Sequence, residues 1–114
     1  MPESQEEILK RDWDTEFIAR MQRAIITSHY KYGWMSDTYP ELAKAVDCIQ
    51  ERLDLYRKTH NADYLTDIAN FAMIEKKCPS YPDAHFTALG SSESPGLAGG
   101  ISYKELVESA KGMD

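Results

Sequence analysis

Residues 61–77 read NADYLTDIANFAMIEKK, and this stretch decides the fold. Leu65, Ile68 and Ala72 recur at spacings of three and four residues, which is the apolar stripe of a packed helix. Most of the other side chains are apolar too, and the polar strip that remains is narrow: Asp63, Asp67 and Asn70. A helix that is apolar over most of its circumference needs neighbours on several sides. We therefore expect it to be the central helix of an all-α domain.

Both ends of this helix carry recognisable signals. Asn61 is a good N-cap, because its side-chain oxygen can accept a hydrogen bond from a free amide of the first turn. At the other end Cys78 precedes Pro79, and proline disfavours helical geometry in the residue before it. These signals place the helix at 61–77.

A long helix is expected earlier in the chain, over 5–32. Ser4 and Glu7 have the spacing of a capping box, which predicts a helix start directly after the serine. Large apolar side chains then fall close to one side: Ile8, Leu9, Trp13, Phe17, Met21 and Ile25. A pause is conceivable at 12–15, where a second cap is available. Gly33 is placed to end the helix as a left-handed C-cap.

A second long helix is expected over 39–58, with Pro40 in its first turn. Its apolar residues step by four, three, four and three positions: Leu42, Val46, Ile49, Leu53 and Tyr56. The link to the central helix is so short that the two helices should pack antiparallel as an αα-hairpin. We expect the following residues to form the hairpin interface: Leu42, Val46, Ile49, Leu53, Leu65, Ile68 and Ala72.

The chain changes character after Lys77. Residues 78–100 hold three of the five prolines and most of the glycines, with serines between them. Aromatic side chains in this segment suggest an ordered arm over the helices, spanning 78–101, and not a free linker. Ser102 then predicts a short last helix at 103–111. We expect the whole chain, 1–114, to be a single domain without strands.

Composition and charge limit the function classes. The chain has 114 residues, of which 42% are hydrophobic and 28% charged, as in an ordinary globular domain. The formal net charge of -6 argues against direct binding of a nucleic-acid backbone, which needs clustered Lys and Arg. It leaves room for a basic partner or for a bound divalent cation.

The cysteines and the N-terminus predict the compartment. Cys48 and Cys78 lack the spacing of a metal site, and we expect two reduced, partly buried thiols. The N-terminal residues MPESQEEILKRD are too acidic and polar for a signal peptide, and no apolar run approaches membrane-spanning length. We therefore expect a cytoplasmic protein that does not bind a membrane.

Four side chains in the middle of the hairpin could carry chemistry. Counted from the bend, Asp54 lies level with Asp67, and Glu51 lies level with Asn70. Carboxylate and amide oxygens are the ligands of a hard cation such as Mg²⁺, which is often completed by the phosphates of a substrate. A plainer alternative remains open. Glu51 and Asp54 lie opposite the apolar seam of their helix, so they could be a solvated acidic face, or a face covered by a second chain.

These acidic pairs resemble the MazG-like all-α nucleoside-triphosphate pyrophosphatases, which carry such pairs on consecutive antiparallel helices. The matching stretches are ERLD at 51–54 and DIAN at 67–70. DIANFA at 67–72 and HYKYG at 29–33 are also similar to phage-encoded members, and the resemblance covers about residues 15–77.

The resemblance implies a metal site and a reaction. Glu51, Asp54, Asp67 and Asn70 would hold Mg²⁺, and the protein would release pyrophosphate from NTPs or dNTPs. The chain departs from the pattern at Asn70, which stands where the family has a carboxylate and lowers the charge available to the metal.

Two cationic residues near the end of the first long helix could contact phosphate. These are His29 and Lys31. The alternative is that they complement the negative end of the helix dipole and need no ligand.

Two functions therefore remain open. The first is a nucleotide-binding protein with a divalent metal, with or without release of pyrophosphate. The second is a non-enzymatic acidic interaction protein, such as a phage inhibitor of a host defence system. In either case we expect a homo-oligomer, most simply a two-fold dimer, because so few helices cannot easily cover the apolar central helix.

Overall fold

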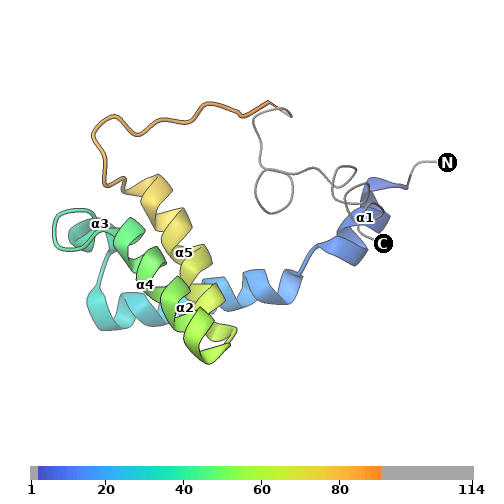
Figure 1. Cartoon of the computed structure of the whole chain (residues 1–114), viewed down its shortest axis with the longest axis horizontal. Helices are drawn as coiled ribbons and strands as arrows, with labels where there is room; N and C mark the ends of the chain where they lie inside the picture. Colours follow the sequence, from blue (N-terminus) through green and yellow to red (C-terminus); the bar gives the residue numbers. More distant parts are fainter. Residues whose placement is uncertain (1–2, 91–114) are drawn as a thin grey trace, which may run out of the picture. The chain divides into compact units, whose positions relative to one another are not determined.

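The computed structural model describes residues 3–90, which form helices and no strands, so the expected all-α fold is confirmed (Figure 1). The helices are, in order, α1 (Gln5–Asp12), α2 (Thr15–Tyr32), α3 (Met35–Thr38), α4 (Ala45–Thr59) and α5 (Asp63–Lys77). All of them belong to one compact unit, Met1–Ala84. None of these helices is long and apolar enough to cross a bilayer.

The first predicted helix is in fact two helices. Ser4 caps α1 as expected, since its Oγ accepts from the amide of Glu7 at 3.1 Å. The helix stops at Trp13, whose backbone is extended, and Asp14 starts α2 by accepting from the amide of Phe17 at 2.9 Å. The uninterrupted helix over 5–32 is therefore wrong, and the pause at 12–15 is confirmed.

The start of the second predicted helix is also wrong. Instead of a plain turn before residue 39 there is a short helix, α3, and Pro40 lies in a turn that follows it. The amides of Leu42 and Ala43 both donate to the carbonyl of Thr38, at 2.9 and 3.0 Å, which holds this turn. Helix α4 begins only at Ala45.

Only the C-terminal end of α5 agrees with the sequence signal. The predicted N-cap is wrong, because Ala62 and not Asn61 is the N-cap, and it makes no side-chain capping bond. Asn61 Oδ1 accepts instead from the amide of Asp63, the first helical residue, at 3.0 Å. Cys78 ends the helix as expected, and its amide donates to the carbonyl of Ile74 at 2.7 Å.

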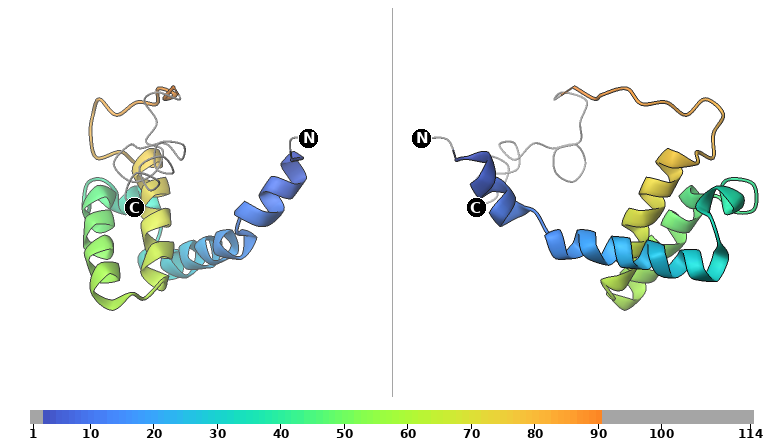
Figure 2. Two further views of the ribbon diagram at one scale, coloured as in Figure 1. Left: turned by 45° about the vertical axis from the view of Figure 1, so that its right-hand side comes forward. Right: turned by 180° about the vertical axis from the view of Figure 1, so that it is seen from behind.

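Helix α5 is the central helix of the unit, as expected. It packs against α4 along the hairpin, where the two helices lie side by side, and against α2, which runs across the hairpin (Figure 2). The bend of the hairpin is formed by His60, which adopts the left-handed conformation with φ 62°.

The predicted core is correct in part. Val46, Ile49, Leu53, Leu65 and Ile68 are half-buried, but Leu42 is 80% exposed and Ala72 is also exposed. Leu42 fails because it lies in the turn before α4 and not on the helix. The most buried residues of α5 are instead spaced by four, on the stripe between α4 and α2: Thr66, Asn70 and Ile74.

Part of the C-terminal prediction lies outside the described residues. The stretch from Pro79 to Gly90 contains no helix or strand, as expected of a loop. The remainder of the predicted arm, Ser102 and the helix at 103–111 fall on residues that the structure does not describe.

Candidate functional site

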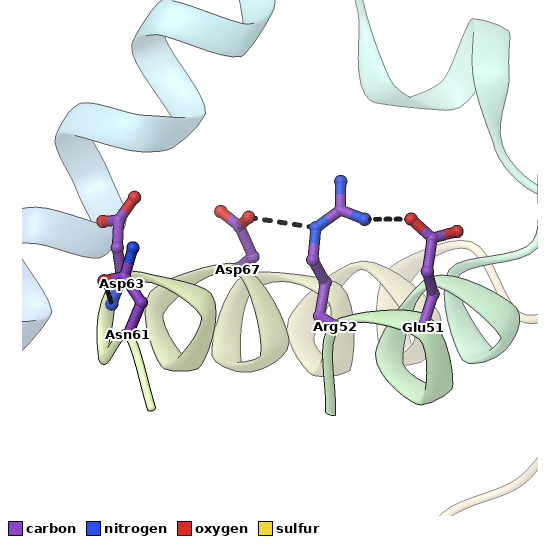
Figure 3. Close-up of polar contacts among 5 residues, drawn as sticks. All are labelled: Glu51, Arg52, Asn61, Asp63 and Asp67. Carbon is purple, nitrogen blue, oxygen red and sulfur yellow. Dashed lines mark hydrogen bonds and ion pairs between the residues drawn. The ribbon is translucent and has the colours of Figure 1, made fainter. Parts of the chain in front are cut away.

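An arginine separates the acids that were expected to share a metal. Arg52 Nε donates to Asp67 Oδ2 at 3.1 Å, and Arg52 Nη1 pairs with the carboxylate of Glu51. Figure 3 shows the three side chains in a row, with the guanidinium between the two carboxylates. The positive charge therefore offsets the repulsion that neighbouring carboxylates would otherwise feel.

The remaining predicted acid, Asp54, is exposed and accepts a hydrogen bond from Gln50 Nε2 at 3.1 Å. Glu51 is exposed as well, so both acids of α4 lie where the alternative of a solvated face places them. Across residues 3–90, no three His, Cys, Asp or Glu side chains are grouped so that they could hold a metal ion. Magnesium binding stays a prediction of the sequence.

Asn70 is not part of an exposed polar strip. Its side chain is only 5% exposed, and its Nδ2 donates to the carbonyl of Met21 in α2 at 3.1 Å. Its Oδ1 is buried and has no hydrogen-bond partner within the described part of the chain. The reason is the crossing of α2 over α5, which buries one side of a strip that looks polar in sequence.

This unit contains a cleft of about 1390 Å³. The second half of α2 and the residues of α3 form one wall, and α4 and α5 form the other. Aromatic rings line it in number: Tyr30, Tyr32, Trp34, Tyr39 and Phe71. Charged side chains also line it: Lys31, Arg52, Lys77, Asp63 and Asp67. In a chain of net charge -6, this lining carries more cations than anions.

The cleft brings together four of the six predicted site residues: His29, Lys31, Asp67 and Asn70. Glu51 and Asp54 do not line it. The ring of His29 lies 4.5 Å from that of Trp34 and 5.6 Å from that of Tyr30, both edge-on. Lys31 is exposed at the last turn of α2.

Three half-buried residues that line the cleft were not predicted from the sequence, and we call them its floor: Tyr39, Arg52 and Phe71. The guanidinium of Arg52 lies over the ring of Phe71, 5.6 Å from its centre, and the ring of Tyr39 meets Phe71 edge-on at 6.4 Å. One signal could have found Arg52. It lies between the two acids of α4, so it was a ready partner for the acid on the neighbouring helix.

The surroundings of these residues shift the pKa values of the titratable side chains at the floor. Burial raises the pKa of the Tyr39 hydroxyl, and the neighbouring Cys48 raises it further. Burial likewise raises the pKa of the Cys48 thiol. Burial opposes the charge of Arg52, yet its pKa is raised overall because Asp67 and Glu51 stabilise the cation. Arg52 therefore supplies a permanent positive charge, while Tyr39 and Cys48 stay protonated near neutral pH.

Comparison of this chain with protein-family models, curated proteins and solved structures finds no match. The resemblance to the MazG-like pyrophosphatases therefore stays a prediction that depends on the quoted motifs.

Proposed function

We propose that the protein binds a nucleotide, or a phosphate compound derived from one, in the cleft between α2, α3, α4 and α5. The observation that supports this most is the lining of the cleft, which combines edge-to-face and exposed aromatic rings with an excess of cations in an acidic chain. A nucleotide needs both features, because its base is flat and apolar and its phosphates are anionic.

Aromatic rings at two levels of the cleft suit a base. Phe71 and Tyr39 form a half-buried pair at the floor. Trp34 is 69% exposed and Tyr32 is 73% exposed, so much of the surface of both residues is accessible to a ligand. Stacking of a base on an aromatic ring contributes about 1–3 kcal/mol.

Cations on both walls suit the phosphates. Lys31 comes from α2 and Lys77 from the end of α5, and both line the cleft. Arg52 uses Nε and Nη1 for the two carboxylates, and Figure 3 shows its third nitrogen pointing away from both. A guanidinium held in place in this way matches phosphate geometry well.

A magnesium ion can enter this proposal with the nucleotide. Mg²⁺ commonly uses one or two protein carboxylates, water and substrate phosphates, and does not need a cage made only of protein. Asp63 and Asp67 line the cleft one helical turn apart on α5 and could supply these carboxylates. Release of pyrophosphate stays a prediction from the family resemblance.

Tryptophan fluorescence tests the proposal directly. The chain has two tryptophans, so a Trp13→Phe variant leaves Trp34 as the only reporter. ATP, dATP and the other common nucleotides are added at millimolar concentration, with Mg²⁺ or with EDTA. We expect at least one of them to quench the fluorescence of Trp34. Lys31→Ala should raise the Kd of the bound nucleotide about tenfold, since a charged contact to phosphate contributes about 1.4 kcal/mol.

A matched control separates the cleft from general charge. Lys58→Ala removes an exposed lysine that does not line the cleft and should leave the Kd unchanged. Pyrophosphate release is measured in the same mixtures. Absence of binding by every nucleotide, with and without Mg²⁺, would reject the proposal.

A specific observation also favours the second candidate function, an acidic interaction protein such as a phage inhibitor of host defence. Tyr30 is 84% exposed beside Trp34 and Tyr32, and aromatic patches of this kind often anchor protein partners. The exposed acids Glu51 and Asp54 would favour a basic partner. Co-purification of one stoichiometric partner, lost in Tyr30→Ala, would support this function over nucleotide binding.

A further inference from the structure

A second hollow, of about 510 Å³, lies between α2 and α5, and no charged side chain of residues 3–90 lines it. We call its lining the α2–α5 face, and it consists of Ile18, Met21, Gln22, Ile25, Ile26, Asn70 and Met73. In a chain with 28% charged residues, seven uncharged residues lining one hollow are unusual. Ile26 is 57% exposed and Met73 is 36% exposed, so much apolar surface on this face meets water.

The unit buries little else to stabilise it. Among the described residues, the only buried hydrophobic side chains are Ala45 and Ile74. A domain of this size normally needs a larger core, because burial of apolar surface is the main favourable term in folding. An additional chain that covers the α2–α5 face would supply the missing burial. A second copy of the same chain could provide this cover without any other partner.

The order of residues along α2 fits a second copy. Ile18, Gln22 and Ile26 are spaced by four, so they form one row along the helix. A two-fold axis through Gln22 would place Ile18 of one copy against Ile26 of the other. The amide of Gln22 carries both donors and an acceptor, so it can pair with its own symmetry mate. This self-complementarity is what an isologous interface requires.

The charges are consistent with this arrangement. Each copy has a net charge of -6, so two copies would repel each other across an acidic surface. On α2, Glu16 pairs with Arg20 at 3.3 Å, which leaves no net charge from these two residues beside the row. The uncharged face is therefore a favourable place for two such chains to meet.

From these observations we infer that the protein is a homodimer in which the two α2 helices pack antiparallel about a two-fold axis at Gln22. Sedimentation should give about twice the chain mass of 13.0 kDa at micromolar concentration. The melting temperature should rise with protein concentration, because folding and association are linked.

A matched pair of substitutions locates the interface. Ile26→Asp places a charge on the α2–α5 face and should raise the dimer dissociation constant at least about a hundredfold, since a buried charge without a partner is strongly unfavourable. Leu9→Asp is the control. Leu9 is also 57% exposed but lies on α1, so this variant should remain a dimer.

Cross-linking tests the symmetry axis even if Ile26→Asp fails to fold. Gln22→Cys places two thiols at the axis and should give a disulfide-linked dimer on mild oxidation. The native cysteines and an Arg23→Cys variant serve as background and neighbour controls. A mass of 13.0 kDa up to about 100 µM, or cross-linking as efficient through Arg23→Cys as through Gln22→Cys, would overturn the inference. So would a dimer that Leu9→Asp disrupts and Ile26→Asp does not.

Discussion

Glu75 Oε1 accepts a hydrogen bond of 3.1 Å from the amide of Val46, which lies 29 residues earlier in the chain. The same carboxylate accepts from the amide and the hydroxyl of Ser80, both at 2.7 Å. Lys44, the residue before α4, makes no side-chain capping bond of its own. Glu75 on α5 therefore caps the first turn of α4 and also fixes the loop that follows α5.

Replacing this carboxylate should loosen the hairpin. Glu75→Gln keeps the shape of the side chain but loses the charge that strengthens its three hydrogen bonds. We expect a loss of about 1–2 kcal/mol in the free energy of unfolding, measured by urea denaturation. Glu41→Gln, at an exposed residue, is the control. Equal losses for the two variants would show that the cap adds nothing.

The same contact should make stability depend on pH. Burial alone would raise the pKa of Glu75, but the hydrogen bonds from Ser80 and Val46 lower it below its usual 4.5. A carboxyl whose pKa is lower in the folded state stabilises the fold above its unfolded pKa. This stabilisation is lost as the pH falls through the folded pKa.

Thermal melts at a series of pH values would measure this effect. Wild type should melt at a higher temperature than Glu75→Gln at pH 7, and the two melting temperatures should converge below pH 4.5. A difference that stays constant down to pH 2 would contradict the assignment of the effect to Glu75 ionisation.

Helix ends were predicted correctly where the capping hydrogen bond is local in sequence, and wrongly where it joins distant parts of the chain. The cap at Ser4 and the pause at 12–15 could be predicted because Ser4 and Asp14 each bond an amide only three residues away. The predicted start of α4 was wrong because Pro40 gave a misleading local signal. The first turn of α4 is capped instead by Glu75, which lies far along the chain. Local patterns identify such helix ends, whereas caps between helices require the fold to be known.

The candidate site shows the same division. Counting residues from the bend predicted that Asp54 lies level with Asp67, whereas in the structure Arg52 links Asp67 to Glu51. The burial of Asn70 could not be predicted, since it depends on the angle at which α2 crosses α5. The pattern of apolar residues identifies the buried side of a single helix, but it does not give the angle at which two helices cross.

Leu53 on α4 and Leu42 in the turn before it should respond differently to truncation. Leu53→Ala should lower the free energy of unfolding by about 2 kcal/mol, because Leu53 lies half-buried on α4. Leu42→Ala should change it by less than about 0.5 kcal/mol, because Leu42 is 80% exposed in the turn. Chemical denaturation of both variants compares them directly. A larger loss at Leu42 would place that residue in a contact absent from the isolated chain, such as one made by a partner.

The Arg52–Asp67 pair gives the last prediction, because a metal site and an ion pair respond differently to the same substitution. If Asp67 belonged to a group of mutually repelling carboxylates, Asp67→Asn would stabilise the metal-free protein. Since Arg52 Nε lies 3.1 Å from Asp67 Oδ2, we expect the opposite, a loss of about 0.5–1 kcal/mol. In a double-mutant cycle with Arg52→Gln, the losses should be less than additive, with a coupling energy of about 0.5 kcal/mol or more. Additive losses would show that the two side chains do not stabilise each other. A gain in stability for Asp67→Asn alone, measured in EDTA, would instead favour the carboxylate group and with it a site for Mg²⁺.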